Sequence, residues 1–162
     1  KDAIKRILNK DLKEIHKMKL DELGIHVEFN EENMLKATAI IIGPEDTPYE
    51  NGILYFIIEF PANYPFSPPK IGYLSSSRYR IHPNLYVGRS HDNFVGKVCL
   101  SAINTWSGPK WTTVMHIGSI LLSIFLFSVI TVVINSVFIY TIGLGNNEKQ
   151  IIINKLRNIR SK

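Results

Sequence analysis

The most reactive side chain in this sequence of 162 residues belongs to Cys99, the only cysteine. A cysteine thiolate is a nucleophile that can carry an acyl group as a thioester. Asn84 precedes Cys99 by fifteen residues and follows Pro83, whose ring restricts the backbone. An amide nitrogen held near a thioester can donate a hydrogen bond to the oxyanion of acyl transfer. The pair therefore predicts an acyl-transfer site, with Cys99 as the nucleophile.

The surroundings of Cys99 decide between a reactive thiol and a buried one, which is the commoner role of a lone cysteine. Basic side chains close in sequence would favour the thiolate. They are Arg89, His91 and Lys97. The flanking segments 93–97 and 101–109 are polar and contain glycine or proline, as exposed loops do. We therefore expect the Cys99 sulfur to be presented to solvent in a turn.

His82 starts the tripeptide that ends at Asn84, and two roles are open to it. It could be the general base of a cysteine hydrolase that uses Cys99. Alternatively, its ring bonds to nearby backbone and orients the turn. No third residue that would orient a histidine base is visible in the sequence, so we expect the orienting role.

The elements that must position these residues follow from hydrophobic periodicity. Residues 1–20 predict an amphipathic helix, with one apolar stripe. The stripe consists of Ile4, Ile7, Leu8, Leu12 and Ile15. Apolar and β-branched runs predict strands at 25–29, 35–42, 53–60 and 71–74, with 53–60 central because it is apolar on both faces. The short connections between the first three strands predict an antiparallel meander.

Several motifs, in this order, resemble the ubiquitin-conjugating enzyme family. The upstream motifs are GPEDTPYENG at 43–52 and FPANYPFSPPK at 60–70. The tripeptide HPN at 82–84 and the run GKVCL at 96–100 follow. The run LSAINTWSGPKW at 100–111 most resembles the larger, Z-type members of the family. The resemblance covers roughly residues 4–124.

The resemblance implies an α+β fold with an N-terminal helix, a four-stranded antiparallel meander sheet, an active-site loop and then C-terminal helices. It implies that Cys99 accepts ubiquitin, or a ubiquitin-like protein, as a thioester from the activating enzyme. A substrate lysine or a ligase would then receive it. Asn84 would stabilise the tetrahedral intermediate or hold the neighbouring loop. His82 and Pro83 would support the active-site loop.

The resemblance also implies partner surfaces. Lys5 and Arg6 match basic residues of the family's first helix, which meets the activating enzyme and partly the ligase. Phe66 matches a ligase contact, although it could instead be a buried aromatic that plugs the proline-rich loop 61–69. The Tyr64–Pro65 peptide bond is expected to be cis.

Two departures from the family pattern lie near the site. The stretch from Asn84 to Cys99 is about twice the usual length, with the extra residues around 86–94; a surface insertion of this kind costs little stability. Residues 112–114 are Thr-Thr-Val, where the family usually has Ser-Pro-Ala, on a loop that contacts ligases.

The family pattern ends within an apolar region. Residues 117–124 predict the helix that follows the active site, and no charged residue occurs from Ile117 through Gly145. We divide the chain into a catalytic core at 1–124, a hydrophobic segment at 125–145 and a basic tail at 146–162. The hydrophobic segment is long enough for a membrane anchor, so membrane association through 117–145 is one interpretation. A helix packed on the core and a frame-changed terminus are the others.

The net charge of +5 does not indicate a nucleic-acid partner, because the basic residues are spread along both ends of the chain without an aromatic-basic motif. One cysteine excludes an internal disulfide and gives no metal-binding cluster. We expect a cytoplasmic protein, or one that also associates with a membrane through 117–145. We expect no cofactor, since the activating enzyme consumes the ATP. The rival functions are a cysteine hydrolase and a non-catalytic ubiquitin-binding or scaffold module.

Overall fold

The computed structural model describes residues 2–75, 79–87, 95–143, 145, 148–151 and 154. The N-terminal segment is helical, as predicted. It consists of α1 (Asp2–Arg6), a π turn η1 (Ile7–Asp11) and α2 (Leu12–Lys17), with a 3₁₀ turn η2 (Leu20–Leu23) after it. Gly24, at a φ of 76°, then reverses the chain into the sheet.

The predicted apolar stripe of this helix is partly wrong. Leu8 is 46% exposed, whereas Ala3, Ile7 and Asp11 are buried. In η1 the Leu12 N–H donates to the Ile7 carbonyl oxygen, five residues back. Such a turn holds more residues than the 3.6 of an α-helix, so positions five apart come onto one face. The wide turn brings Arg6 and Asp11, five residues apart, onto one face, while the buried positions Ala3, Ile7 and Asp11 recur every four residues.

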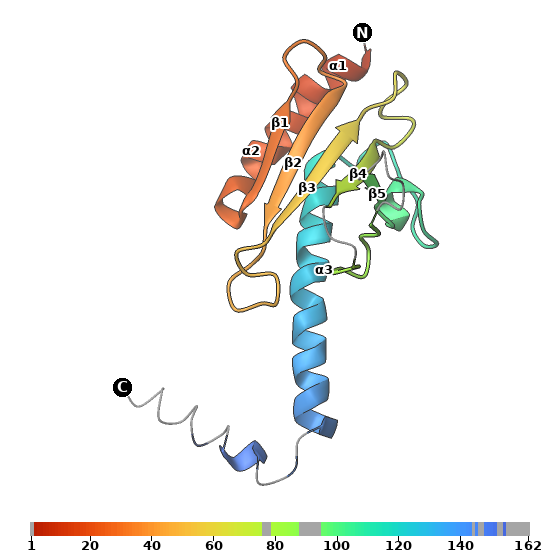
Figure 1. Ribbon diagram of the computed structural model, residues 1–162. Coiled ribbons are helices and arrows are strands. Elements are labelled where there is room, and N and C mark those ends of the chain that lie inside the picture. Colours follow the sequence, from red (N-terminus) through yellow and green to blue (C-terminus); the bar gives the residue numbers. More distant parts are fainter. Residues whose placement is uncertain are drawn as a thin grey trace. The chain divides into compact units, whose positions relative to one another are not determined.

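The sheet contains the predicted antiparallel meander and one strand more. Strands β1 (Ile25–Phe29), β2 (Lys36–Ile42), β3 (Ile53–Glu59) and β4 (Lys70–Leu74) are followed by β5 (Val95–Lys97), in the order β1-β2-β3-β4-β5 (Figure 1). β3 is central, as predicted. The prediction of four strands missed β5 because a strand of three residues is too short to show alternation.

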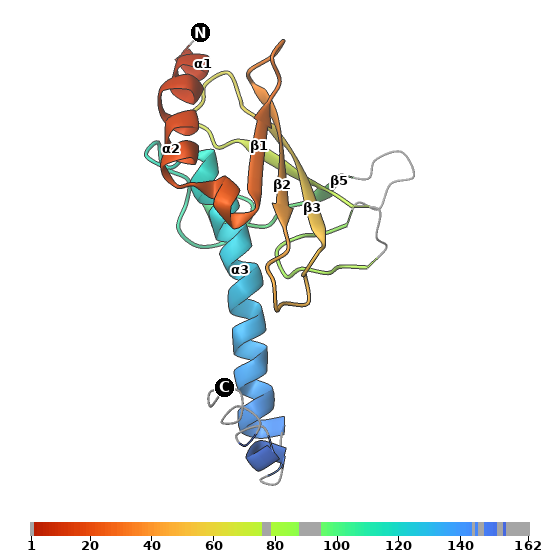
Figure 2. The ribbon, with the colours of Figure 1, turned by 90° about the vertical axis from the view of Figure 1, so that its left-hand side faces the viewer.

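The hydrophobic core lies between one face of this sheet and the helices. Alternate residues of β2 and β3 are buried, as a sheet packed on one side requires. They are Ala37, Ala39, Ile41, Leu54, Phe56 and Ile58. Figure 2 shows the N-terminal helix and the first turns of α3 (Ile117–Phe138) on the same side of the sheet. The buried stripe of α3 matches the predicted one. It consists of Ile117, Ile120, Leu121 and Ile124.

The chain forms two compact units, 1–128 and 129–162, so the first extends slightly beyond the predicted core boundary. In the second unit the apolar side chains of Ile130, Val133 and Ile134 are 48%, 54% and 62% exposed. α3 continues into η4 (Ile139–Gly143). Among the described residues, α3 alone is long and apolar enough to cross a membrane, with a mean hydropathy of 2.7. The predicted hydrophobic segment is therefore continuous with a helix that begins in the core.

Candidate acyl-transfer site

The turn His82-Pro83-Asn84 is held by its own first residue. His82 Nδ1 accepts a hydrogen bond from the Asn84 backbone N–H at 3.0 Å, and the Leu85 N–H donates to the His82 carbonyl oxygen at 3.2 Å. Leu85 is completely buried and bridges to Val98, next to Cys99. The tight turn is thus fixed to the strand segment that leads into Cys99. Pro83 lies exposed at its tip.

His82 makes the side-chain-to-backbone contact expected of an orienting residue, and it is poorly suited to be a general base. Its side chain is buried, and its Nδ1 is occupied by the Asn84 N–H. Burial, together with the positive charge of Arg80, lowers the pKa of His82 from 6.5 to about 4. The imidazole is therefore neutral near pH 7 and a weak base. Tyr49 packs against it, with ring centroids 5.8 Å apart.

Asn84 and Cys99 are brought together by two reciprocal hydrogen bonds. The Cys99 N–H donates to the Asn84 carbonyl oxygen at 2.8 Å, and Asn84 Nδ2 donates to the Cys99 carbonyl oxygen at 2.9 Å. The amide side chain thus lies next to the cysteine backbone, fifteen residues away in sequence. The sequence predicts an amide within reach of an acyl group on the Cys99 sulfur, and the contacts found here are with the Cys99 backbone.

The predicted exposure of Cys99 is wrong, because the residue is only 5% exposed. Val98 and Leu100 on either side are also buried. Residues 95–97 were expected in an exposed loop but pair with β4 as β5, so Cys99 lies two residues beyond the end of a sheet strand. Lys97 is exposed, whereas Arg89 and His91 lie outside the described residues, as does most of the extra stretch at 86–94.

Arg80 and Tyr86, which the sequence did not single out, hold the two ends of the turn. Arg80 Nε donates to the His82 carbonyl oxygen at 3.1 Å, and the Arg80 guanidinium lies 3.9 Å from the centroid of the Tyr86 ring. The Tyr86 N–H in turn donates to the Lys97 carbonyl oxygen at 2.9 Å. A cation over an aromatic face is attractive, so this pair closes the base of the turn.

The residues predicted to bind partners have different surroundings. Lys5 is exposed, as expected. Phe66 is 80% exposed, so the alternative of a buried plug is wrong. Its loop is fixed by a cis Tyr64–Pro65 bond, as predicted, and by Trp111 Nε1, which donates to the Pro65 carbonyl oxygen at 2.7 Å.

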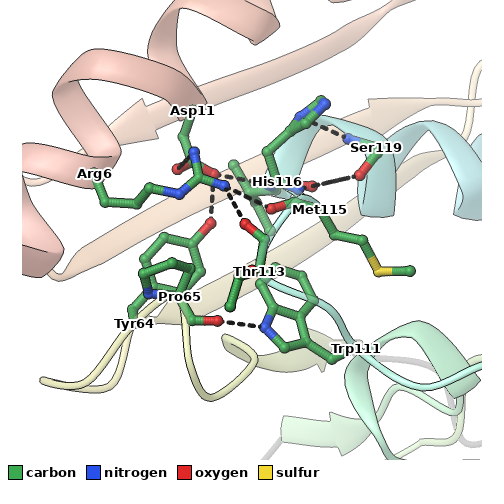
Figure 3. Close-up of polar contacts among 10 residues, drawn as sticks. Arg6, Asp11, Tyr64, Pro65, Trp111, Thr113, Met115, His116 and Ser119 are labelled. Carbon is green, nitrogen blue, oxygen red and sulfur yellow. Dashed lines mark hydrogen bonds and ion pairs between the residues drawn. The ribbon is translucent and has the colours of Figure 1, made fainter.

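Arg6 is turned inward, which corrects the prediction of a displayed basic residue. Its side chain is 13% exposed, and Nη2 donates to the carbonyl oxygens of Thr113 at 3.1 Å and Met115 at 2.8 Å (Figure 3). The π turn places Asp11 on the same face, 3.7 Å from Nη1. The family resemblance implied a surface role for Arg6, while the packing gives it an internal one.

Asp11 is the centre of this internal network and was not singled out by the sequence. Its Oδ1 accepts hydrogen bonds from Tyr64 Oη at 2.7 Å and from the Ile117 backbone N–H, at the start of α3, at 2.9 Å (Figure 3). Burial, followed by the bond to Asp11, raises the pKa of Tyr64, so its hydroxyl remains a donor. One buried carboxylate thus joins the first helix, the proline-rich loop and α3.

Comparisons with known proteins agree with this fold. Residues 7–129 match the family model described as ubiquitin-conjugating enzyme. The chain belongs to the ubiquitin-conjugating enzyme family. The ubiquitin-conjugating enzyme E2 Z of Homo sapiens is 40% identical over 94 residues, which are 57% of this chain and 25% of that protein. That of Danio rerio is 39% identical over 103 residues, 62% of this chain and 29% of that protein.

A solved structure of the human ubiquitin-conjugating enzyme E2 G1 is also similar, with a TM-score of 0.58 and 26% identity over 76% of this chain and 92% of that chain. The predicted likeness to the Z-type members of the ubiquitin-conjugating enzyme family is therefore confirmed, as is the fold. The chain spans less than a third of the length of the two E2 Z proteins. Within the described residues, no cluster of three or more His, Cys, Asp or Glu side chains could hold a metal ion.

Proposed function

We propose that this chain is a ubiquitin carrier with Cys99 as the acceptor. The Cys99 thiolate attacks the thioester of ubiquitin on the activating enzyme, a new sulfur–acyl bond forms, and the activating enzyme's thiol leaves. A substrate lysine or a ligase cysteine then attacks this thioester and releases the Cys99 thiol. The observation that carries the proposal is the reciprocal pairing of Asn84 with Cys99, the only cysteine of a chain in this family.

The low exposure of Cys99 bears on how the thioester forms. A sulfur in a residue that is 5% exposed offers little surface to an incoming acyl group. Acylation therefore requires the covering side chains to move, and the bound partner must supply the free energy for this opening. Exposed Lys5 and Phe66 are available for such contacts with the activating enzyme and a ligase, whereas Arg6 is not.

The direct test is charging with activating enzyme, ubiquitin and ATP. We expect one ubiquitin to join the chain in a thiol-sensitive adduct that Cys99→Ala abolishes. Cys99→Ser should form a thiol-resistant ester instead, because a hydroxyl acylated at the same position gives an oxygen ester. The adducts are read by gel electrophoresis with and without reductant.

Two controls make the charging result decisive. Circular dichroism shows whether each variant is folded, and a folded wild-type chain that forms no adduct would favour the non-catalytic ubiquitin-binding module. An adduct that survives Cys99→Ala would place the acceptor elsewhere and refute the assignment. Release of free ubiquitin without any trapped adduct would favour the hydrolase.

We also propose that the apolar helix beyond the family domain enters a lipid bilayer. The match to the family model ends at residue 129, and the first compact unit ends at Ser128. Beyond that point Val133, Ile134 and Val137 are more than half exposed, and no charged residue occurs before Glu148. An uncharged, apolar and unburied helix favours hydrocarbon over water. The nearby basic tail suits anionic headgroups.

Flotation of the full chain with phosphatidylcholine vesicles that contain phosphatidylserine tests the bilayer proposal. We expect the wild-type chain to float and Ile134→Lys to reduce the floated fraction at least tenfold, because a charge within the hydrocarbon is costly. Ile53→Lys is the matched control, since Ile53 is 65% exposed on the family domain and Ile134 is 62% exposed. A wild-type chain that stays in the soluble fraction, or equal loss in both variants, would overturn the proposal.

A further inference from the structure

Trp106 is an exposed tryptophan in the segment that follows Cys99. It is 57% exposed, whereas Trp111, at the other end of the same loop, is 8% exposed and bonded to Pro65. Tryptophan is among the residues that contribute most to binding when a partner covers it. The two tryptophans therefore differ in role: Trp111 is part of the fold, and Trp106 is available to a partner.

Thr105 fixes the position of Trp106 relative to Cys99. Thr105 Oγ1 lies 2.9 Å from the Leu100 N–H donor and 2.8 Å from the Val98 carbonyl oxygen, and the Thr105 N–H donates to the Leu100 carbonyl oxygen at 3.1 Å. Val98 and Leu100 are the two neighbours of Cys99. The base of the Trp106 loop is thus hydrogen-bonded on both sides of the nucleophile.

The rest of the loop is also held in place. Asn104 has a φ of 61° and accepts a hydrogen bond from the Trp111 N–H at 3.1 Å, which closes the loop at its far end. Gly108, at a φ of 126°, approaches Ser101 so closely that a Cβ there would lie 3.1 Å from the Ser101 Cβ. A loop fixed at both ends presents its exposed aromatic side chain with little loss of entropy on binding.

We propose that Trp106 is a docking residue for the ubiquitin-like protein that is joined to Cys99, and that it packs against apolar side chains near that protein's carboxyl terminus. The inference rests on the proposed function. A protein joined to Cys99 through its terminal carboxyl group must pass its last residues beside the Val98–Leu100 segment, where Thr105 fixes the loop. Because Cys99 is only 5% exposed, binding next to it is needed to bring the acyl group to the sulfur.

Single-turnover charging tests this role of Trp106. The full chain is mixed with increasing concentrations of preformed activating enzyme–ubiquitin thioester, and the initial rate of adduct formation is measured. We expect Trp106→Ala to raise the half-saturating concentration at least tenfold with a smaller effect on the maximal rate, since the contact contributes to binding. Trp106→Phe should retain most of the wild-type affinity. Ile53→Ala, which removes an apolar side chain that is 65% exposed at the start of β3, should charge like wild type.

The outcomes separate this inference from the carrier proposal. If the wild-type chain forms no Cys99 adduct, the carrier proposal fails. If Trp106→Ala forms the adduct with wild-type half-saturation, only the docking inference fails. If Trp106→Ala charges normally and loses only ligase-stimulated transfer, the partner that binds Trp106 is the ligase, and the inference is overturned. An unchanged melting temperature of Trp106→Ala confirms that the fold is intact. If Trp106→Ala melts at a lower temperature and Trp106→Phe also charges more weakly, Trp106 is a residue of the fold instead.

Discussion

Replacing Asn84 with alanine should slow transfer of ubiquitin from Cys99 to lysine about a hundredfold, the usual cost of losing one oxyanion donor. Charging should stay close to wild type, because the attacking group in that step is a thiolate, a stronger nucleophile than an amine, and it needs the donor less. The physical basis is the position of Asn84 Nδ2, which is 2.9 Å from the Cys99 carbonyl oxygen. This donor is next to the residue on which the proposed tetrahedral intermediate would form.

The measurement is single-turnover discharge of preloaded chain to free lysine, compared with the rate of charging. Asn84→Asp keeps the shape of the side chain but removes the N–H donor, so it should be as slow as the alanine variant. Asn33→Ala is a control of the same type, because Asn33 Oδ1 accepts from the Leu35 N–H in a turn on another part of the chain. Equal damage to charging and discharge would refute the donor role and leave Asn84 with the role of holding the loop.

The sequence predicted those parts of the fold that are encoded in local patterns. Strands β1 to β4 alternate or are long enough to be recognised, and the cis Tyr64–Pro65 bond lies in a distinctive proline-rich motif. β5 escaped prediction because pairing with β4 defines it, and its own three residues do not. Local periodicity reports which residues are apolar, and it does not report which distant strand will pair with them.

The errors at the site have the same origin. The polar residues around Cys99 indicated exposure, but the bridge between Leu85 and Val98 and the strand pairing of β5 place Cys99 among buried residues. The family resemblance implied a surface role for Arg6, but the π turn directs it toward Asp11. In both cases the burial is produced by contacts between residues far apart in sequence. The pairing of Asn84 with Cys99 was suggested by their residue types and strengthened by the order of the motifs, which resembles a family.

Replacing Asp11 with alanine should lower the free energy of unfolding by about 3 to 5 kcal/mol, the range for breaking a buried ion pair. The carboxylate is fully buried and accepts from Tyr64 Oη and the Ile117 N–H. Its removal leaves both donors without their acceptor, and it leaves the partly buried Arg6 guanidinium without its opposite charge. Each unsatisfied buried group costs free energy that the unfolded chain does not lose, because water solvates it there. Urea unfolding followed by tryptophan fluorescence measures the effect.

Two further variants separate the parts of this network. Asp11→Asn keeps an acceptor oxygen and removes the charge. Its free energy of unfolding should therefore lie between those of wild type and Asp11→Ala. Glu22→Ala removes the exposed ion pair of Lys19 and Glu22, whose nitrogen–oxygen distance is 2.8 Å, and should change stability little despite the shorter contact. If Asp11→Ala were no more destabilising than Glu22→Ala, Asp11 would not join the elements as proposed. A large loss would instead mean that one buried carboxylate in the first helix holds α3 and the Phe66 loop in place, so that the proposed partner contacts of Phe66 depend on a residue without solvent exposure.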